Sequence, residues 1–321
     1  MKTFLFFFAA IFSSLLFCGC SPVAVYEGSF PVMSTVCEVK IISSDREKAA
    51  SVAGDVKALL KKIESDLNFY DPESRISVIN REAPYGFVAL TADEQALVRR
   101  SLQMSVLTGG AFDITFFPVW EVWKKTAKKQ RIPTNREISE AVANTGYRKI
   151  VLSKDGKKIK FASKKISINL GGIAKEYALI KCAGLLKERG MSNALVSLGG
   201  DILALGKGNG SGWKIGIQDP FDPEEIRKTV VVEDKLVLTS GVYQRYVEIG
   251  GKKYHHIIDA RTGHPADDLA SVTIIKDIDS TIPISSIAVF LMEKKRSAEY
   301  LKKHPSIGYF IIGRDGSGLQ R

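Results

Sequence analysis

The chain has 321 residues, of which 45% are hydrophobic and 25% charged, and its formal net charge is +11 at pH 7. This is the composition of a globular protein with a large core, and it excludes a disordered or low-complexity chain. The lysines are scattered in pairs without an interleaved aromatic stripe. The basic balance therefore predicts exposed charged faces and no nucleic-acid partner.

The N-terminus has the features of an export signal. Lys2 precedes an apolar run from Phe4 to Phe17, which is too short to cross a bilayer and is right for a signal peptide. A Cys-Gly-Cys sequence follows, in which the small residue Gly19 precedes Cys20. This resembles a bacterial lipoprotein cleavage site with Cys20 as the lipidated residue, and the alternative is an ordinary cleaved secretory signal.

These features divide the chain into three parts. The prediction is a lipoprotein signal peptide over 1–19, a tether over 20–30 that reaches the fold near residue 32, and one folded domain over 31–321. The lipid would anchor the protein on the non-cytoplasmic side of a bacterial membrane, in the cell envelope, which is the periplasmic face if the cell has two membranes. Cys37 and Cys182 remain as partners for one disulfide, which their spacing does not establish.

Helical and strand patterns alternate through the rest of the chain. Apolar spacing and capping residues predict helices over 45–67, 91–108, 138–144, 173–189 and 284–292. Strands are predicted over 35–42, 150–152, 158–161, 165–169, 193–198, 202–205, 213–218, 228–232, 236–239, 243–249, 252–258, 270–275 and 309–312. Because no regular βαβ rhythm appears, we expect an α+β fold, one large domain of interleaved helices and mostly antiparallel sheet.

A double glycine marks the predicted junction between the strand that ends at Asn169 and the following helix. Gly171 and Gly172 let backbone N–H groups approach a ligand closely, and the start of a helix favours an anion such as a phosphate. Lys175 lies in the first turn and can reach the same anion. The alternative is a turn that only joins a strand to a helix.

Two further clusters carry polar groups beyond what packing requires. Phe112 and Asp113 follow a second double glycine, which is also compatible with a helix end followed by a buried pair. His256 lies in a strand pattern that ends in a carboxylate, and a histidine in such a place can accept a proton from a hydroxyl near neutral pH. The alternative is a strand-end histidine bonded to the backbone. No His or Cys pair has the spacing of a zinc site.

Taken in chain order, these clusters resemble the ApbE family of FAD:protein FMN transferases, from about Phe30 to about Met292. The matching motifs are Met33-Ser34-Thr35, Tyr70-Asp71-Pro72-Glu73-Ser74, Thr108-Gly109-Gly110-Ala111-Phe112-Asp113, Asn169-Leu170-Gly171-Gly172-Ile173-Ala174-Lys175, Leu198-Gly199-Gly200-Asp201, Thr239-Ser240-Gly241 and the run from His256 to Pro265. The resemblance implies an enzyme that transfers the FMN moiety of FAD, through its phosphate, to a threonine hydroxyl of an acceptor protein and releases AMP. The alternatives are hydrolysis of FAD to FMN and AMP, and a non-catalytic FAD-binding lipoprotein.

The resemblance also assigns roles to residues. It implies His256 as the base for the acceptor threonine, and the acceptor as a membrane redox subunit. The implied FAD contacts are Met33, Tyr70, Ala111, Phe112, Asp113, Asn169, Lys175 and Ile257.

The family's Mg²⁺ site carries over only in part. The resemblance implies Gly172, through its carbonyl, and Ser286 as ligands, but Ile282 stands at the position of the family's aspartate. Since Mg²⁺ prefers carboxylate oxygen, Asp277 or Asp279 from the preceding loop is one candidate to substitute. The alternatives are a weak metal site, or a protein that binds FAD without turning it over well. Glu176 stands where the family usually has glycine.

Overall fold

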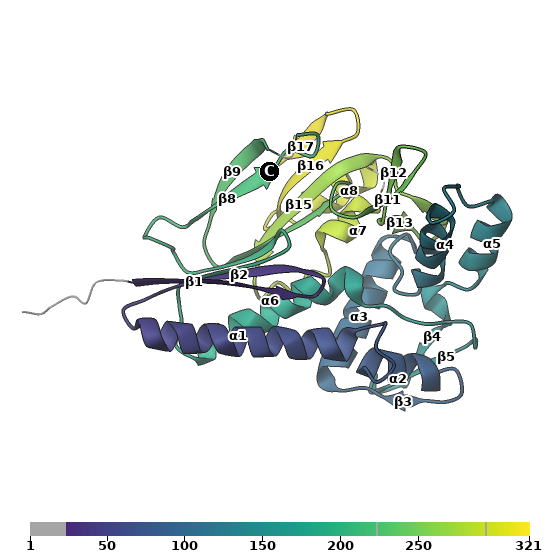
Figure 1. Ribbon diagram of the computed structural model, residues 1–321, viewed down its shortest axis with the longest axis horizontal. Coiled ribbons are helices and arrows are strands. Elements are labelled where there is room, and N and C mark those ends of the chain that lie inside the picture. The colour runs from purple at the N-terminus through teal and green to yellow at the C-terminus, as the bar shows by residue number, and fades with distance from the viewer. Residues whose placement is uncertain (1–23, 223, 293) are drawn as a thin grey trace, which may run out of the picture.

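The computed structural model describes residues 24–222, 224–292 and 294–321, and its centre is an eight-stranded sheet (Figure 1). The strand order is β1–β2–β6–β7–β10–β15–β16–β17, and every neighbouring pair is antiparallel. The strands are Ala24–Val32 (β1), Thr35–Ser43 (β2), Ala194–Leu198 (β6), Asp201–Leu205 (β7), Lys235–Gly241 (β10), Leu269–Asp277 (β15), Gly308–Gly313 (β16) and Gly318–Gln320 (β17). The predicted α+β class with a mostly antiparallel sheet is confirmed.

Helices and small sheets surround this sheet. The helices are Arg46–Leu67 (α1), Arg75–Glu82 (α2), Ala92–Leu107 (α3), Phe117–Ala127 (α4), Asn135–Ala143 (α5), Gly171–Glu188 (α6), Ser286–Phe290 (α7) and Lys294–Lys302 (α8), with one 3₁₀ turn at Tyr147–Lys149. The remaining strands are Val88–Ala89 (β3), Ile150–Leu152 (β4), Lys158–Phe161 (β5), Trp213–Gln218 (β8), Ile226–Val232 (β9), Tyr246–Ile249 (β11), Lys252–His255 (β12), Ile258–Asp259 (β13) and His264–Pro265 (β14).

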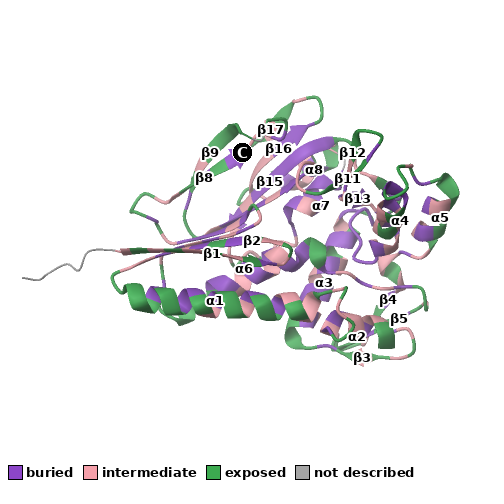
Figure 2. Cartoon of the chain, in the orientation of Figure 1, coloured by how far each residue is buried: buried purple, intermediate pink, exposed green. Residues whose placement is uncertain are grey.

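Helices α1 and α6 pack against the part of the sheet that contains β1, β2, β6, β7 and β10. The outer surface of α1 is exposed and its inner stripe is buried (Figure 2). By contrast, α6 is apolar on several sides, and Leu179, Cys182 and Leu186 are fully buried. Burying one leucine stabilises the fold by about 1.5–3 kcal/mol. This packing holds α6 firmly in the interior.

The predicted tether is wrong for residues 24–32. They form β1, which pairs with β2 along its whole length, from Ala24 opposite Ser43 to Val32 opposite Thr35. The inward side chains alternate, as a half-buried strand requires, with Tyr26 and Phe30 packed against the core. A glycine and a proline interrupt this pattern in the sequence, and the edge position of β1 tolerates the proline.

The strand predicted over 165–169 is also wrong. Its backbone bonds to side chain and loop groups instead of to a third strand. Asn80 pairs with the backbone of Ile168, donating from Nδ2 to the carbonyl at 2.9 Å and accepting from the N–H at 2.7 Å. The N–H of Asn169 donates to the Ile114 carbonyl at 2.7 Å. These bonds fix the chain just before α6.

Cys37 and Cys182 do not form the disulfide that their spacing left open. Cys37 and Cys182 are both buried free thiols, and burial raises the pKa of Cys37 to about 12.

Within the described ranges, no helix has the length and apolar character needed to cross a bilayer. The predicted signal peptide and Cys20 lie outside the described residues, so the lipid anchor stays a prediction.

Candidate active site

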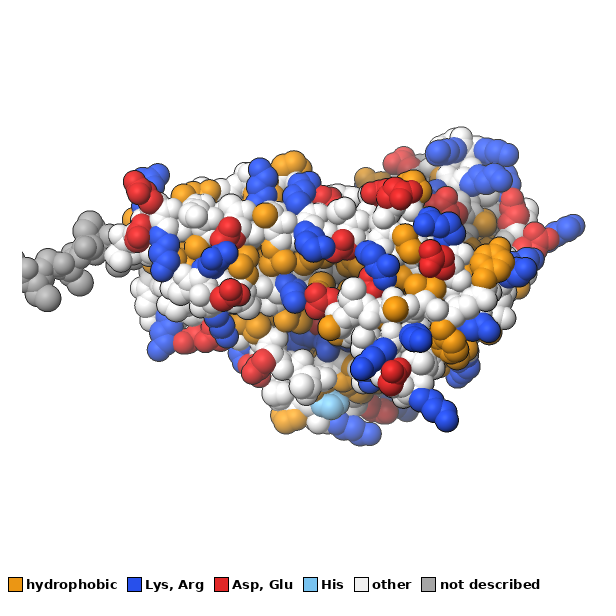
Figure 3. Space-filling view, turned by 90° about the horizontal axis from the view of Figure 1, so that it is seen from below, with side chains coloured by type: hydrophobic (Ala, Val, Ile, Leu, Met, Phe, Trp, Pro, Cys, Tyr) orange, Lys and Arg blue, Asp and Glu red, His pale blue; other side chains and the backbone are white. Residues whose placement is uncertain are grey.

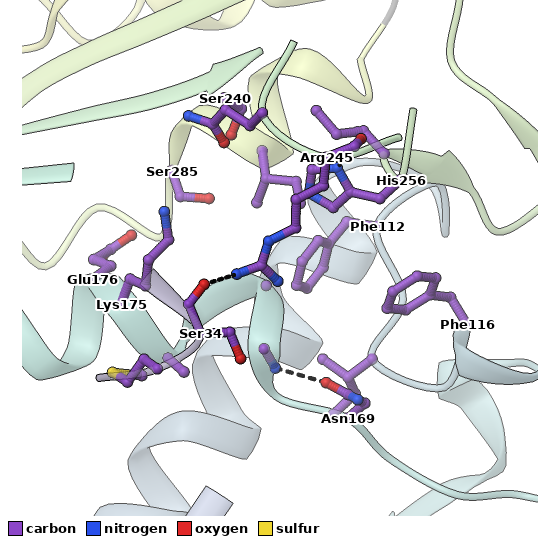
Figure 4. Close-up of a pocket in the computed structure, with 18 of the residues that line it drawn as sticks. Ser34, Phe112, Phe116, Asn169, Lys175, Glu176, Ser240, Arg245, His256 and Ser285 are labelled. Carbon is purple, nitrogen blue, oxygen red and sulfur yellow. Dashed lines mark hydrogen bonds between the residues drawn. The ribbon is translucent and has the colours of Figure 1, made fainter. Parts of the chain in front are cut away.

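A cavity of about 550 Å³ lies between the β1–β2 turn, the start of α6 and the start of α7 (Figure 4). The residues that the sequence analysis assigned to FAD, the base and the metal all line it, although they come from distant parts of the chain. They are Met33, Tyr70, Ala111, Phe112, Asp113, Asn169, Gly172, Lys175, His256, Ile257 and Ser286. The structure therefore brings the predicted site together, while the role of each residue stays a prediction.

The β1–β2 turn enters the cavity in a strained conformation. Met33 and Ser34 both have positive φ angles, 52° and 57°, a region that favours glycine. Glu64 and Arg245 hold the turn from either side. The Met33 N–H donates to Glu64 Oε1 at 2.6 Å, and Arg245 Nη2 donates to the Ser34 carbonyl at 3.4 Å (Figure 4). Arg245 thereby places a cation beside the cavity.

The loop after α3 is fixed by a buried carboxylate. Asp113 Oδ1 accepts hydrogen bonds from the N–H and hydroxyl of Thr115, at 2.8 and 2.7 Å, and Oδ2 accepts from the Tyr147 N–H at 2.6 Å. Burial raises the pKa of Asp113, although these hydrogen bonds oppose the rise. Both oxygens have protein partners, so this carboxylate holds the loop that carries Phe112.

The start of α6 opens onto the cavity. Its N-cap residue, Leu170, has no side-chain cap, and Asn169 Oδ1 accepts from the Gly171 N–H at 2.8 Å (Figure 4). A Cβ on Gly172 would lie 3.1 Å from Cε2 of Phe112, so glycine allows the aromatic ring to lie against the helix. The first turn therefore presents the positive end of the helix dipole to a ligand.

Lys175 is held by an ion pair across the cavity. Its Nζ lies 2.7 Å from Asp201 Oδ2, and Asp201 Oδ1 accepts from the Thr239 N–H at 2.9 Å. Burial raises the pKa of Asp201, and the positive charge of Lys175 opposes that rise. The Leu198–Asp201 and Thr239–Gly241 motifs thus position Lys175.

His256 has one ring nitrogen bound to the backbone. Its Nδ1 lies 3.0 Å from the Arg245 carbonyl, which also accepts from the His256 N–H at 3.1 Å. Because a carbonyl only accepts, Nδ1 carries the proton and Nε2 is the acceptor. Burial lowers the pKa of His256 to about 4, with Arg245 and Lys175 adding to the shift. The ring is therefore neutral at pH 7.

The neighbouring histidines His255 and His256 lie in different surroundings. His255 ends β12, earlier than the predicted strand end at residue 258, and is only 3% exposed. Its ring lies 6.0 Å from that of Phe290, and both ring nitrogens lack hydrogen-bond partners. His256 follows the strand and faces the cavity.

The part of the cavity lined by Gly172 and Ser286, the predicted metal corner, contains oxygen donors. None of them comes from the loop that carries Asp277 and Asp279. Asp277 pairs with Lys235, and neither Asp277 nor Asp279 lines the cavity, so that prediction is wrong. No cluster of three or more His, Cys, Asp or Glu side chains suitable for a metal occurs among the described residues. Ser286 Oγ lies 2.9 Å from Ser240 Oγ, and Glu176 contributes a buried carboxylate to the same cavity.

The carboxylate of Glu176 has one satisfied and one free oxygen. Oε1 accepts from Arg100 Nη2 at 2.7 Å and from Lys276 Nζ at 2.6 Å. Oε2 is buried without a hydrogen-bond partner. A free carboxylate oxygen, a serine hydroxyl and a carbonyl are the donor types that a hard divalent cation prefers, so the residues present fit such an ion.

Several residues around the site gave no usable sequence signal. Glu64, Arg245, Arg100 and Lys276 lie in no recognised motif, and their partners are far away in sequence. Asn80 was likewise missed. The only sequence hint was Glu176, a charged residue in the second turn of an apolar helix.

Comparison with known proteins decides the family. The sequence profile of the ApbE family matches residues 33–311. This chain belongs to the ApbE family. The predicted resemblance is therefore confirmed.

Other ApbE proteins resemble this chain over nearly its full length. The FAD:protein FMN transferase of Treponema pallidum is 29% identical, covering 92% of this chain and 87% of that protein. The ApbE protein structure from Thermotoga maritima has a TM-score of 0.82 at 29% identity, covering 92% and 97% of the two chains. The flavin transferase ApbE structure from Vibrio cholerae has a TM-score of 0.80 at 23% identity, covering 94% and 97%, and shows the shared fold.

The charges outside the ApbE cavity are mixed. On the face shown in Figure 3, Lys and Arg side chains are interspersed with Asp and Glu and do not form a single stripe. Many pair with a neighbour, as Lys62 does with Asp66 and Arg136 does with Glu140. The cavity itself combines Lys175, Arg245 and a helix start, which together suit an anionic ligand such as a diphosphate.

Proposed function

We propose that this protein transfers the FMN moiety of FAD to a threonine hydroxyl of an acceptor protein and releases AMP. The observation that carries the proposal is the shared cavity, in which a neutral His256 with an acceptor Nε2 lies with the start of α6 and Lys175. The relative from Treponema pallidum, which aligns with most of the chain, is named FAD:protein FMN transferase, and this name supports the transfer of FMN from FAD to a protein.

In the proposed reaction, the threonine oxygen attacks the phosphorus of the FMN half. A new P–O bond forms to threonine, the P–O bond to the AMP phosphate breaks, and AMP leaves. The hydroxyl proton passes to His256 Nε2, while Nδ1 stays bonded to the Arg245 carbonyl. Lys175, Arg245 and the N–H groups at the start of α6 stabilise the charge that develops on the phosphate oxygens.

The protonation of His256 sets an expected pH dependence. Its pKa is lowered to about 4, so the free enzyme loses its base only as the pH falls toward 4. The negative charge of bound FAD favours the imidazolium form and raises the pKa of His256 back toward the ordinary value of a histidine. The constant kcat/KM reports the pKa of His256 in the free enzyme, whereas kcat reports its pKa in the FAD complex. As the pH is lowered, we therefore expect kcat to fall first and kcat/KM to fall only at a lower pH.

We also propose Mg²⁺ dependence. The Gly172 carbonyl and the Ser286 hydroxyl line the same corner of the cavity and would hold the ion. When bound, Mg²⁺ supplies positive charge that neutralises the diphosphate and polarises its oxygens. Both residues lie beside the helix start, where the chain's own N–H groups and Lys175 orient the same phosphates.

The cellular setting is a further part of the proposal. The sequence before the described residues supports a lipid on Cys20 and a position on the non-cytoplasmic side of a bacterial membrane. An acceptor in a membrane redox complex fits this position, because a flavin attached there can carry electrons at the membrane. Labelling of intact cells with a lipid analogue, compared with Cys20→Ala, tests the anchor.

A mass measurement tests the activity. Residues 21–321 are incubated with FAD, Mg²⁺ and a threonine-bearing acceptor, and acceptor mass and AMP are measured together. Acceptor that gains one FMN for each AMP supports the proposal. AMP without labelled acceptor would indicate FAD hydrolysis, whereas tight FAD binding without either product would contradict both activities. An acceptor with the threonine changed to valine is the matched control.

A further inference from the structure

Glu176 is a buried acid whose two oxygens have different surroundings, since two cations share one oxygen and the other has no partner. The residue is 5% exposed, and its Oε1 accepts from both Arg100 and Lys276. Its Oε2 is buried and has no hydrogen-bond partner. A buried charged oxygen without a partner is costly, because it has lost its water without replacement. The structure therefore holds one oxygen of this carboxylate ready for a ligand.

Glu176 lies in the same corner as the other oxygen donors. Gly172 is four residues earlier, so the two residues share one face of α6. Glu176, Gly172 and Ser286 all line the cavity. In Figure 4, Glu176 lies next to Lys175 on the side of the cavity where Ser285 projects.

Two cations attach the segment before α7 to Glu176. Arg100 Nη2 also approaches the carbonyls of Ile282 and Ile284, at 3.1 and 3.4 Å, and Lys276 Nζ donates to the Ile284 carbonyl at 2.8 Å. Both donors bind the same oxygen of Glu176. This leaves Oε2 free and keeps the carboxylate close to the start of α7, which carries Ser286.

We propose that Glu176 Oε2 is the carboxylate ligand of a divalent cation, together with the Gly172 carbonyl and Ser286 Oγ. In this proposal the carboxylate ligand is Glu176 on α6. The segment before α7 provides no carboxylate, because Ile282 stands at the position of the family's aspartate. This inference rests on the proposed function, since the cation would serve the same FAD site. Hard cations such as Mg²⁺ and Mn²⁺ bind carboxylate, hydroxyl and carbonyl oxygens, which are the donors present here.

A competing arrangement exists within the same cluster. Arg100 Nε is also buried without a partner. A rotation of its guanidinium would allow Nε to donate to Glu176 Oε2 and form a two-bond fork. In that arrangement Glu176 would be a purely structural ion-pair partner and would hold no metal.

Binding of Mn²⁺ to the FAD-loaded protein tests the assignment. Mn²⁺ is titrated by electron paramagnetic resonance, which measures bound metal without any turnover. We expect Glu176→Gln to weaken Mn²⁺ binding at least tenfold. The matched control is Glu94→Gln, since Glu94 is another buried glutamate paired with an arginine, at 2.9 and 3.1 Å, and lies outside the cavity. The control should stay within twofold of the unaltered protein.

Two further variants keep the test decisive if Glu176→Gln is poorly folded. Glu176→Gln combined with Lys276→Met removes the acid together with one buried cation, and should still lose Mn²⁺ affinity. Glu176→Gly combined with Ile282→Asp moves the carboxylate to the other side of the corner and should restore binding. Unchanged Mn²⁺ affinity in folded Glu176→Gln would overturn the inference and favour the arginine fork.

The test of Glu176 as a metal ligand and the test of the proposed transferase activity can fail independently. FAD affinity and acceptor labelling are measured on the unaltered protein in parallel. Labelling of the acceptor without any effect of Glu176→Gln on Mn²⁺ would reject Glu176 as a ligand and leave the transferase. Loss of Mn²⁺ in the variant, with no labelling by the unaltered protein, would support the ligand and reject the transferase.

Discussion

The two sides of the cavity differ in how their polar groups are satisfied. On the side that carries Asp113 and His256, both carboxylate oxygens and one ring nitrogen are bonded to the protein. In the corner of α6 and α7, Glu176 keeps a free buried oxygen and Lys175 has a single acidic partner. The first side is already organised by its own hydrogen bonds, whereas the second keeps a buried carboxylate oxygen without a protein partner.

This contrast predicts different consequences for variants on the two sides. Changes on the organised side should affect the rate or the stability of the protein and leave ligand affinity nearly constant. Changes in the corner should affect affinity for FAD or a cation. The predictions below test this division.

The largest effect is expected for His256→Ala. Loss of a general base lowers the rate of such reactions by about a hundredfold to ten-thousandfold, and we expect about a thousandfold for acceptor labelling. The affinity for FAD, followed by flavin fluorescence, should stay within threefold. His304→Ala is the control, because His304 lies outside the cavity. Labelling at the normal rate in His256→Ala would remove this residue from the mechanism.

Asp113→Ala should mainly reduce stability. The variant leaves the Tyr147 N–H and the Thr115 groups without their acceptor in the interior, so we expect the free energy of unfolding to fall by about 3 kcal/mol. Urea denaturation measures it.

Asp315→Ala is a matched control for this loss. Asp315 accepts from the N–H and hydroxyl of Ser317, two residues on, as Asp113 does from Thr115, but in an exposed turn. We expect a much smaller loss there, because water replaces the lost acceptor. Equal losses in the two variants would contradict a special role for burial at Asp113.

The buried His255, next to the organised side, should make the protein sensitive to acid. Its pKa is lowered to about 4 by burial, whereas an unfolded histidine titrates near 6.5. The unfolded state therefore binds the proton first as the pH falls, and at pH 5 this costs about 2 kcal/mol of stability. His255→Leu should remove that loss between pH 8 and pH 5. An unaltered pH dependence of unfolding would contradict this account.

The smallest effect is expected at Lys175. Lys175→Met alone would leave Asp201 buried without its partner, so the test uses Lys175→Met with Asp201→Asn. We expect about tenfold weaker FAD binding, as for loss of one charged hydrogen bond. Asp201→Asn alone keeps the lysine, and its amide oxygen can still accept from Lys175, so FAD binding should weaken less than in the double variant. Equal affinities of the two variants would show that Lys175 does not contact the diphosphate.

Motifs with local constraints were predictable from the sequence. The Gly171-Gly172 turn, Phe112 and His256 were each recognised from short patterns, and the structure brings all of them to one cavity. A Cβ at position 172 would crowd the nearby Phe112 ring, and this kind of local constraint leaves a trace in the sequence.

Contacts between distant residues were not predictable. Asn80 binds the backbone of Ile168, 88 positions away, and so replaces the strand that alternation had predicted. Lys276 reaches Glu176 across 100 positions. Neither partner has a pattern around it that identifies the other, so the sequence did not place Glu176 in the corner of α6 and α7. The edge strand β1 was missed because Gly28 and Pro31 interrupt the alternation of inward and outward side chains in its sequence.

The position of β1 also limits how far the cavity lies from a bilayer. With a lipid on Cys20, as proposed, three residues separate the anchor from Ala24, and the four Cα–Cα steps between them reach at most about 14 Å. The nine residues of β1 then extend about 30 Å to the turn at Met33, which lines the cavity. An acceptor threonine would therefore have to lie within about 45 Å of the membrane surface, and lengthening the chain before Ala24 would change which acceptors are in reach.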